Sequence, residues 1–437
     1  MKKIAHDIFS LVKQEGGTAA RFIFHDTDMR EVSVRDGGIE KKDSGRRVSF
    51  TITVWIGERV ASVSGNDISL SSLHVLVKQA CDIARMSEPD PYAILAPRSM
   101  WPLNCDSVLK QLNLCDTSFV PTMNDLMKWA LEIDSENNTR SGISTSCAGV
   151  CYGKGTSFTI TTEGFELSSA ATSFSAFADC VAKQDTDMSS GSFGDSVRHF
   201  SDLLPFKEIG KTAGDLSLQL IGAKPIPTGS MPIVLSRMVS DSLLGHFANA
   251  ITGENVFKKR SFLKESLNKR IFSPGVAIID DPLIPRLLSS FVADRECTAR
   301  QKITFVKDGV LTGFATNMKS AAKLACPSTG HADGFGNLYM ENGEVTPEKL
   351  ISGIERGVYV ISFIGHGPNI VTGDYSRGVR GFLIENGKIT RPVQGITVAG
   401  NLSDMFLNLS VANDLDIGRY NAPTLRIDGM TIAGEQS

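Results

Sequence analysis

The chain has 437 residues, of which 41% are hydrophobic and 21% charged, a composition typical of a soluble globular protein with more than one domain. Its formal net charge of −3 argues against nucleic acid or an anionic membrane as a partner, because both attract proteins with a basic excess. No uncharged apolar run approaches the roughly 18 residues of a membrane span, and the first residues resemble an amphipathic helix rather than a secretory leader, so we expect a cytoplasmic protein.

The beginning of the chain predicts a first helix followed by antiparallel strands. Residues 21–65 alternate apolar and polar side chains, with turn signals at Gly37-Gly38 and Gly57-Glu58, which is the pattern of a strand meander. Residues 69–87 then predict a helix with one apolar face, which ends at the breaker "EPDPYA". Eight cysteines without a CxxC pair predict reduced thiols rather than a disulfide framework.

The next part of the chain repeats this plan with a helix from residue 122 and paired strands from about 149 to 185. The stretch "AGVCYGKGTSF" resembles a phosphate loop, but Lys154 is followed by glycine where a P-loop has Ser or Thr, so a hairpin turn is the better interpretation. The Gly/Ser-rich residues 185–196 predict a flexible loop, whose purpose composition does not indicate.

A further helix from about residue 204 leads to the Pro-rich segment "AKPIPTGSMP", where we place the main domain boundary. We therefore expect an N-terminal α+β domain over 1–224, built from two similar halves of helix plus strands at about 1–95 and 118–224. A strand-rich C-terminal domain is expected over 225–437, with hairpin turns at Asp308-Gly309 and Asn386-Gly387. The predicted fold class is α+β, rich in antiparallel sheet.

One histidine stands in the apolar helix "MVSDSLLGHFANAITG". On a helical wheel His246 shares a stripe with Leu243 and Ala250, so it is expected to point inward. Zinc on a helix needs a second ligand three or four positions away, and those positions hold Ser242, Leu243, Asn249 and Ala250. The residues therefore predict a buried, hydrogen-bonded histidine rather than a metal ligand.

The segment "FIGHGPNIVTGDYSRG" is rich in glycine and polar residues within apolar surroundings. It can be a loop that connects two strands, or the wall of a cleft where the backbone approaches a ligand closely. A Ser376/His366/Asp374 hydrolase is a further hypothesis, although the G-x-S-x-G spacing is not met.

Five ordered motifs extend over the chain: "LLGHFANAITGENVFKKRSFL", "STGHADG", "GHGPNIVTGDYSRGVRGFLIENGKITRPV", "ITVAGNLSDMFLNL" and "VANDLD…APTLRIDGMTIAG". Together they resemble the TldD/PmbA family, and more closely its PmbA branch, which is also called TldE. The resemblance implies a subunit of a cytosolic metallopeptidase complex, in which a TldD-type and a TldE-type chain cleave peptides or unfolded proteins in a cavity between them.

The chain departs from the pattern of the TldD members, which carry HExxxH on the helix that corresponds to the His246 segment. In those members two histidines bind zinc, and the glutamate is the general base that activates water. The TldD members also place a cysteine ligand after the NDL motif, where "NDLDIGRYNAPTLR" has no cysteine. The resemblance thus implies that zinc belongs to a TldD-type partner, that this chain binds no metal, and that His246 is structural or substrate-facing.

We expect this subunit to shape the peptide cleft, with strand edges that align an extended substrate. Each candidate for the lining can equally be a turn or capping residue, and Asp374 and Arg377 can instead pair with each other at the surface. The candidates are His246, His366, Asn369, Asp374, Ser376, Arg377 and Asn401.

Two alternatives stay open. The first is an independent homodimeric metallopeptidase with a site built from His246, His366 and His331. The second is a regulatory binding protein, because members of the family have been described as modulators of DNA gyrase. The charge balance disfavours direct contact with DNA in that case.

Overall fold

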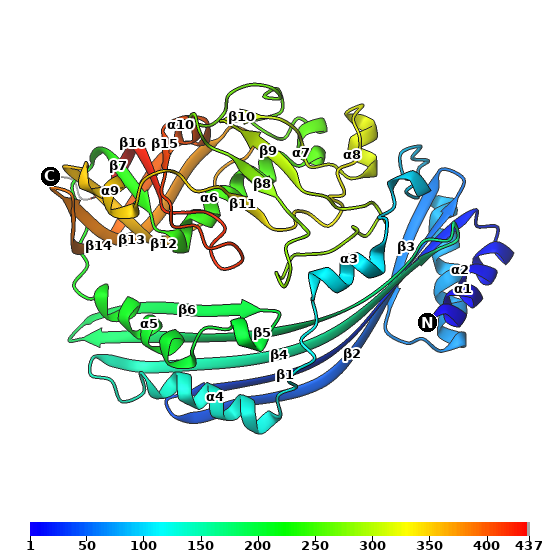
Figure 1. The fold of residues 1–437 in the computed structure, drawn as a ribbon, viewed down its shortest axis with the longest axis horizontal. Coiled ribbons are helices and arrows are strands. Elements are labelled where there is room, and N and C mark those ends of the chain that lie inside the picture. Colours follow the sequence, from blue (N-terminus) through cyan, green and yellow to red (C-terminus); the bar gives the residue numbers. More distant parts are fainter. Residues whose placement is uncertain (435–437) are drawn as a thin grey trace.

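The N-terminal half forms one long, curved antiparallel sheet of six strands in a computed structural model that describes residues 1–434 (Figure 1). The strand order is β3-β2-β1-β4-β5-β6, so both predicted halves contribute to the same sheet through the pairing of β1 with β4. The strands are β1 (Ala19–Arg35), β2 (Gly38–Ile56), β3 (Arg59–Gly65), β4 (Ile143–Thr161), β5 (Glu166–Gln184) and β6 (Asp187–Val197).

Two pairs of helices cover one face of this sheet at its two ends. Alternate residues of a strand point to opposite faces, and the even-numbered residues of β1 face the helices. Phe22 and Phe24 pack in one core with α1 (Lys2–Gln14) and α2 (Leu70–Met86), and Val32 and Val34 pack in a second core with two further helices. Those helices are α4 (Met123–Ser135) and α5 (Phe206–Gln219), and α3 (Cys105–Leu112) lies in the connection between the halves. Short 3-10 turns lie at Arg98–Met100 and Phe200–Asp202.

The Gly/Ser-rich residues 185–196 form a strand, so the prediction of a flexible loop there is wrong. Only Asp185 and Thr186 turn the chain, and β6 then pairs with β5 over its whole length. A Cβ atom on Gly191 would lie 2.4 Å from the backbone nitrogen of Ser217 in α5. The small residues therefore allow close packing of a helix on the strand, a role that composition does not distinguish from flexibility.

The prediction of a hairpin turn around Lys154 is also wrong, because this residue lies within the continuous strand β4. Gly149 and Gly153 face side chains of the neighbouring strand β5: a Cβ on Gly149 would lie 2.3 Å from the ring of Phe177. Gly149 makes room for the ring of Phe177, and Gly153 for the hydroxyl of Ser173. The glycines do not mark a change of direction.

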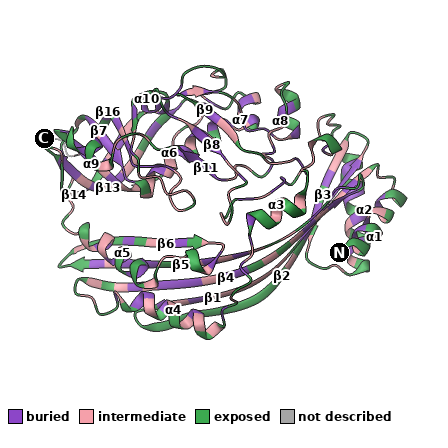
Figure 2. Ribbon diagram, viewed as in Figure 1, coloured by how far each residue is buried: buried purple, intermediate pink, exposed green. Residues whose placement is uncertain are grey.

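The strand β2 is longer than its outer neighbour. Only Phe50–Ile56 pairs with β3, so the outer edge from Gly38 to Ser49 has no adjacent strand within the described residues. Residues 38–47 are all exposed, which Figure 2 shows as a green stretch of β2. Three ion pairs tie this stretch to β1: Glu40–Arg35 at 2.8 Å, Lys41–Glu31 at 2.9 Å and Arg46–Asp26 at 2.6 Å.

The C-terminal part contains a second six-stranded sheet in the order β14-β13-β12-β7-β16-β15, and β14 also pairs with β16, which closes the sheet on itself. A four-stranded sheet, β10-β9-β8-β11, lies beside it. The larger sheet comprises β7 (Gly229–Leu235), β12 (Arg356–Ile364), β13 (Asp374–Glu385), β14 (Lys388–Asn401), β15 (Leu409–Val411) and β16 (Leu425–Ala433). The smaller comprises β8 (Ile278–Asp280), β9 (Ile303–Lys307), β10 (Val310–Leu311) and β11 (Leu338–Met340).

Five helices belong to this part: α6 (Arg237–Ala250), α7 (Gly253–Phe257), α8 (Met318–Lys323), α9 (Pro347–Ser352) and α10 (Leu402–Leu407). Both predicted hairpins are confirmed, since Asp308-Gly309 joins β9 to β10 and Asn386-Gly387 joins β13 to β14, with positive φ at all four residues. The α+β class is confirmed as well. Residues 435–437, the end of the expected C-terminal domain, lie outside the described residues.

The two parts of the chain are joined by a buried ion pair. Arg419 donates from Nε and Nη2 to the two carboxylate oxygens of Asp195 in β6, both at 3.1 Å. The Asp195 side chain is only 3% exposed. The segment predicted as a free loop thus carries a fixed contact with the C-terminal part. Among the residues described, no helix is both long enough and apolar enough to cross a membrane. The eight cysteines are free thiols.

Candidate functional site

The helix α6 buries Leu243, Phe247 and Ala250 in the large C-terminal core. At about 100° per residue, His246 lies about 60° from Leu243 and about 40° from Ala250, at the border of this buried stripe. The imidazole is consequently half-buried, and its Nε2 atom, although shielded from solvent, has no hydrogen-bond partner among the described residues. The expectation of a buried, hydrogen-bonded histidine is thus met only in part for its burial and is wrong for the hydrogen bond.

The surroundings of His246 come from β13 and from the loop before it. The imidazole lies edge-on to the ring of Tyr375, with 6.2 Å between ring centroids and 68° between planes. A Cβ on Gly367 would lie 3.5 Å from His246 Cε1, so the glycine-rich loop passes next to the ring at this atom. Burial, with a smaller effect from the positive charge of Arg377, lowers the pKa of His246 to about 4. The imidazole is therefore neutral at pH 7.

Arg377 does not pair with Asp374, so that alternative is wrong. The two residues are three apart on a strand and point to opposite faces of the sheet. The Arg377 guanidinium carbon lies 4.1 Å from the centroid of the Phe363 ring, and its Nε is buried without a partner in the described chain. Burial raises the pKa of Tyr375 to about 12, so a protonated phenol, a neutral imidazole and a guanidinium meet at one place.

Three other candidates form a turn next to this group. The backbone N–H of Asn369 donates to the Asp374 carbonyl at 2.9 Å, and the Asn369 side chain accepts from the Val371 N–H. The Asp374 carboxylate accepts from Thr372 Oγ1 at 2.6 Å and from Asn401 Nδ2 at 3.4 Å. Asn401 Oδ1 in turn caps α10 by accepting from the Ser403 N–H. Asn369, Asp374 and Asn401 therefore shape the loop that lies beside His246.

The remaining two candidates, His366 and Ser376, are exposed. Asp374 already accepts hydrogen bonds from Thr372 and Asn401, and no hydrogen bond joins Asp374 to His366 or Ser376 in the described part of the chain. The Ser376/His366/Asp374 arrangement of a hydrolase is therefore not assembled in this structure.

The residues around His246 do not fit a metal ion. The positions one turn away on α6 hold Ser242, Leu243, Asn249 and Ala250, and the guanidinium of Arg377 is near enough to disfavour a second positive charge. Residues 1–434 contain no group of three or more His, Cys, Asp or Glu side chains placed to hold a metal.

The alternative site that includes His331 is not supported either. His331 Nε2 lies 3.2 Å from Asp280 Oδ2, and its Nδ1 lies 2.8 Å from the Thr329 carbonyl oxygen, so both ring nitrogens are engaged.

Tyr375 and Phe363 were not expected from the sequence. Tyr375 stands between two candidates in the motif "GDYSRG", and strand alternation places it on the same face as Arg377. This alternation could have identified Tyr375 as a neighbour of Arg377 from the sequence alone. The contact with His246, by contrast, depends on how α6 packs against β13, which no local pattern predicts.

Three family models match the chain in order: PmbA/TldA metallopeptidase domain 1 over residues 20–84, the central domain over 119–221 and the C-terminal domain over 228–434. Metalloprotease PmbA from Escherichia coli O157:H7 is 30% identical over 410 residues, which cover 92% of this chain and 90% of that protein. A metalloprotease TldD homolog from Haemophilus influenzae is 27% identical over 255 residues, covering 51% of this chain and 52% of the homolog.

Solved structures share the whole fold. A protein from Bacteroides thetaiotaomicron that is described as a modulator of DNA gyrase has a TM-score of 0.92 at 26% identity, with 99% of both chains covered. TldE from Thermococcus kodakarensis has a TM-score of 0.80 at 17% identity, with 99% of this chain and 100% of that chain covered.

Proposed function

The chain belongs to the PmbA/TldD metallopeptidase family, and we propose from this premise that it acts as a TldE-type subunit. In this role it pairs with a zinc-binding TldD-type subunit in the cytoplasm and shapes the cleft in which that subunit cleaves peptides or unfolded proteins. The observation that carries the proposal is the position of Arg377 beside His246. A guanidinium there opposes a zinc ion at the histidine of α6 and favours a substrate-facing role.

The chemistry around His246 suits a peptide backbone. The buried Nε2 of His246 and the Nε of Arg377 both lack partners within the described residues, and the Tyr375 phenol remains protonated at pH 7. These groups offer hydrogen bonds that a peptide amide can complete without regard to its side chains. In this proposal His246 and Arg377 contact the substrate, and the exposed His366 and Ser376 lie at the rim. Asn369, Asp374 and Asn401 hold the loop in place.

The test is the zinc content and the peptidase activity of this chain, purified alone and again after co-expression with a TldD-type chain that carries HExxxH. We expect the isolated chain to be free of zinc and inactive, and the pair to bind about one zinc and cleave peptide. Zinc together with cleavage in the isolated chain would contradict the proposal and support an independent homodimeric peptidase.

Replacing Arg377 by alanine is expected to lower peptide cleavage by the assembled pair by about 10- to 100-fold, the effect of losing one charge-assisted hydrogen bond worth about 1.5–3 kcal/mol. The melting temperature should change little, because a cation stacked on an aromatic ring contributes only about 0.5–1 kcal/mol near a surface. Steady-state kinetics and thermal denaturation provide the two measurements.

Arg391→Ala, on the exposed part of β14, is the matched control and should leave both values unchanged. If Arg377→Ala loses stability in proportion to its loss of activity, Arg377 is structural and its assignment to the cleft is wrong.

A second candidate function is regulatory binding within a gyrase-related pathway, which the description of the Bacteroides relative favours. A net charge of −3 weighs against direct binding to DNA, so the effect would proceed through protein contacts. Affinity purification that recovers gyrase but no TldD-type protein would favour this candidate over the peptidase subunit.

A further inference from the structure

A cavity of about 770 Å³ lies between the two parts of the chain, away from His246. One wall is the face of the N-terminal sheet opposite its helices, where the odd-numbered residues of β1, such as Arg21 and Ile23, point. Residues 291–296 and 317–319 of the C-terminal part form the facing wall. The volume is that of a small-molecule or peptide site.

Hydroxyl and aromatic side chains surround Arg21 on the sheet. Its register partner on β2 is Thr53, and Trp55 lies two residues further along that strand. The guanidinium carbon of Arg21 lies 5.6 Å from the centroid of the Trp55 ring. The indole Nε1 donates to the Ala93 carbonyl oxygen, which fixes the ring in place.

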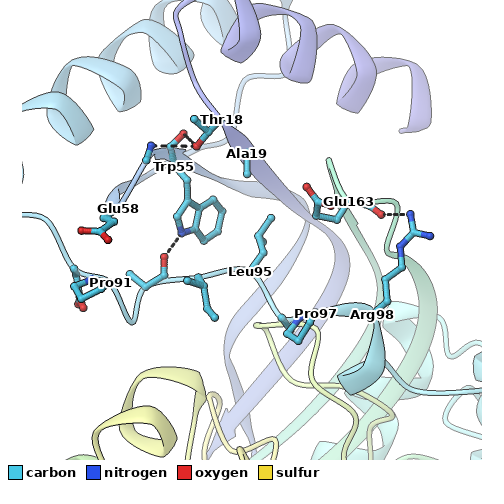
Figure 3. A pocket seen from close by; sticks show the side chains of 14 residues that line it. Thr18, Ala19, Trp55, Glu58, Pro91, Leu95, Pro97, Arg98 and Glu163 are labelled. Carbon is cyan, nitrogen blue, oxygen red and sulfur yellow. Dashed lines mark hydrogen bonds between the residues drawn. The ribbon is translucent and has the colours of Figure 1, made fainter.

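Trp55 also lines a second cavity of about 330 Å³, whose other residues include Leu95, Pro97 and Arg98 (Figure 3). Asp90, Ala93 and Ile94 border both spaces, so the indole and the segment around residues 90–94 separate two adjoining compartments. Trp55 therefore forms part of the boundary of the cavity that contains Arg21.

The charged groups of the larger cavity leave one cation without a partner. Lys319 pairs with Asp90 at 2.6 Å, and Arg295 lies 3.7 Å from Asp333. Arg21 has no carboxylate within 4.0 Å among residues 1–434, and its Nε is buried without a hydrogen-bond partner there.

The two remaining acids in the walls are engaged elsewhere. Asp294, 4% exposed, accepts from the backbone N–H groups of Glu296, Thr298 and Ala332. Glu296 Oε2 accepts from the Met318 N–H at 2.8 Å, and burial raises the pKa of the Glu296 carboxyl. Neither acid therefore neutralises Arg21 by direct contact.

We propose that this inter-domain cavity binds the terminal carboxylate of a short peptide, with Arg21 as the anchor, Trp55 as a flat apolar wall and the sheet hydroxyls as hydrogen-bond partners. A guanidinium binds a carboxylate through two parallel hydrogen bonds, which is the geometry that Arg21 lacks within the chain. The choice of a peptide as the source of the carboxylate rests on the proposed function, because every peptide cleavage creates a new carboxyl terminus.

The experiment compares two probes on the full chain without any partner, an N-acetylated tetra-alanine with a free carboxylate and the same peptide as its amide. Isothermal titration calorimetry should show the acid binding about 10- to 100-fold more tightly, the range for a hydrogen bond to a charged group. Arg21→Gln should remove that preference. Arg21→Lys, which keeps the charge but not the two-pronged geometry, should retain part of it.

Arg46→Gln is the matched control, because Arg46 is an exposed arginine of the same sheet and pairs with Asp26 outside the cavity. It should bind the acid like the unaltered chain. Equal binding of acid and amide, no binding of the acid, or an unchanged preference in Arg21→Gln would each overturn the proposal. The comparison of probes on the unaltered chain holds even if Arg21→Gln fails to fold.

This test is independent of cleavage. If the isolated chain prefers the acid while the co-expressed pair shows no peptidase activity, the carboxylate site stands and the proposed function fails. If the pair cleaves peptide but the chain binds acid and amide alike, the proposed function stands and the carboxylate site fails.

Discussion

Replacing Asp280 by alanine is expected to lower the free energy of unfolding by about 1–3 kcal/mol, the cost of leaving a buried hydrogen-bonding group without its partner. The side chains of Asp280 and His331 are 2% and 4% exposed, and the pair is flanked by the rings of Phe305 and Phe335. A carbonyl oxygen can only accept, so Nδ1 of His331 must donate its proton to Thr329. Nε2 is then the ring nitrogen that hydrogen-bonds Asp280, and removal of the carboxylate leaves this buried atom without a partner.

Chemical denaturation followed by circular dichroism measures this loss. Asp280→Asn should cost less than Asp280→Ala, because an amide keeps the shape of the side chain and can still hydrogen-bond Nε2. Asp82→Ala, at a side chain that is 53% exposed on α2, is the control and should stay within about 0.5 kcal/mol of the unaltered chain. A loss below about 1 kcal/mol in Asp280→Ala would show that the pair adds nothing to stability.

The second large effect concerns the contact between the two parts of the chain. Arg419→Met should cost about 2–5 kcal/mol, because it leaves the nearly inaccessible Asp195 carboxylate without its two-pronged partner. Asp195 keeps only a backbone hydrogen bond from the Leu204 N–H at 3.0 Å. The C-terminal part should therefore separate from β6 before either part unfolds.

Limited proteolysis and denaturation together detect this separation. The double variant Asp195→Asn/Arg419→Met removes the uncompensated charge as well, so it should lose less stability than the sum of the single variants. Additive losses would mean that the two side chains do not interact in solution, in contrast with the geometry described above.

Patterns that lie within one element were sufficient for much of the fold. Alternation along β1 and the apolar face of α2 indicated the correct buried residues, and the Asp-Gly and Asn-Gly pairs indicated both C-terminal hairpins. These features depend on neighbours within a few positions, where sequence spacing and spatial distance agree.

Features that depend on packing between distant elements were not predictable in the same way. The glycines of β6 indicated flexibility because glycine serves both loops and close packing, and only the position of α5 decides between them. The wheel placed His246 on the correct helix, yet its lowered pKa depends on burial and on the charge of Arg377 of another element. The sequence did not indicate a role for Arg21, because its lack of an acidic partner depends on the facing wall of the cavity, which comes from a distant part of the chain.

The long unpaired margin of β2 carries an implication for behaviour at high concentration. Exposed strand margins are templates on which further chains can add and grow into insoluble fibres. Two copies joined in antiparallel fashion about Ser44 would set Lys41 opposite Arg47 and Lys42 opposite Arg46, and like charges at facing positions destabilise such a pair. These basic side chains thus disfavour the pairing of two copies at the exposed edge of β2 and so oppose aggregation. An acidic strand could still pair with this edge.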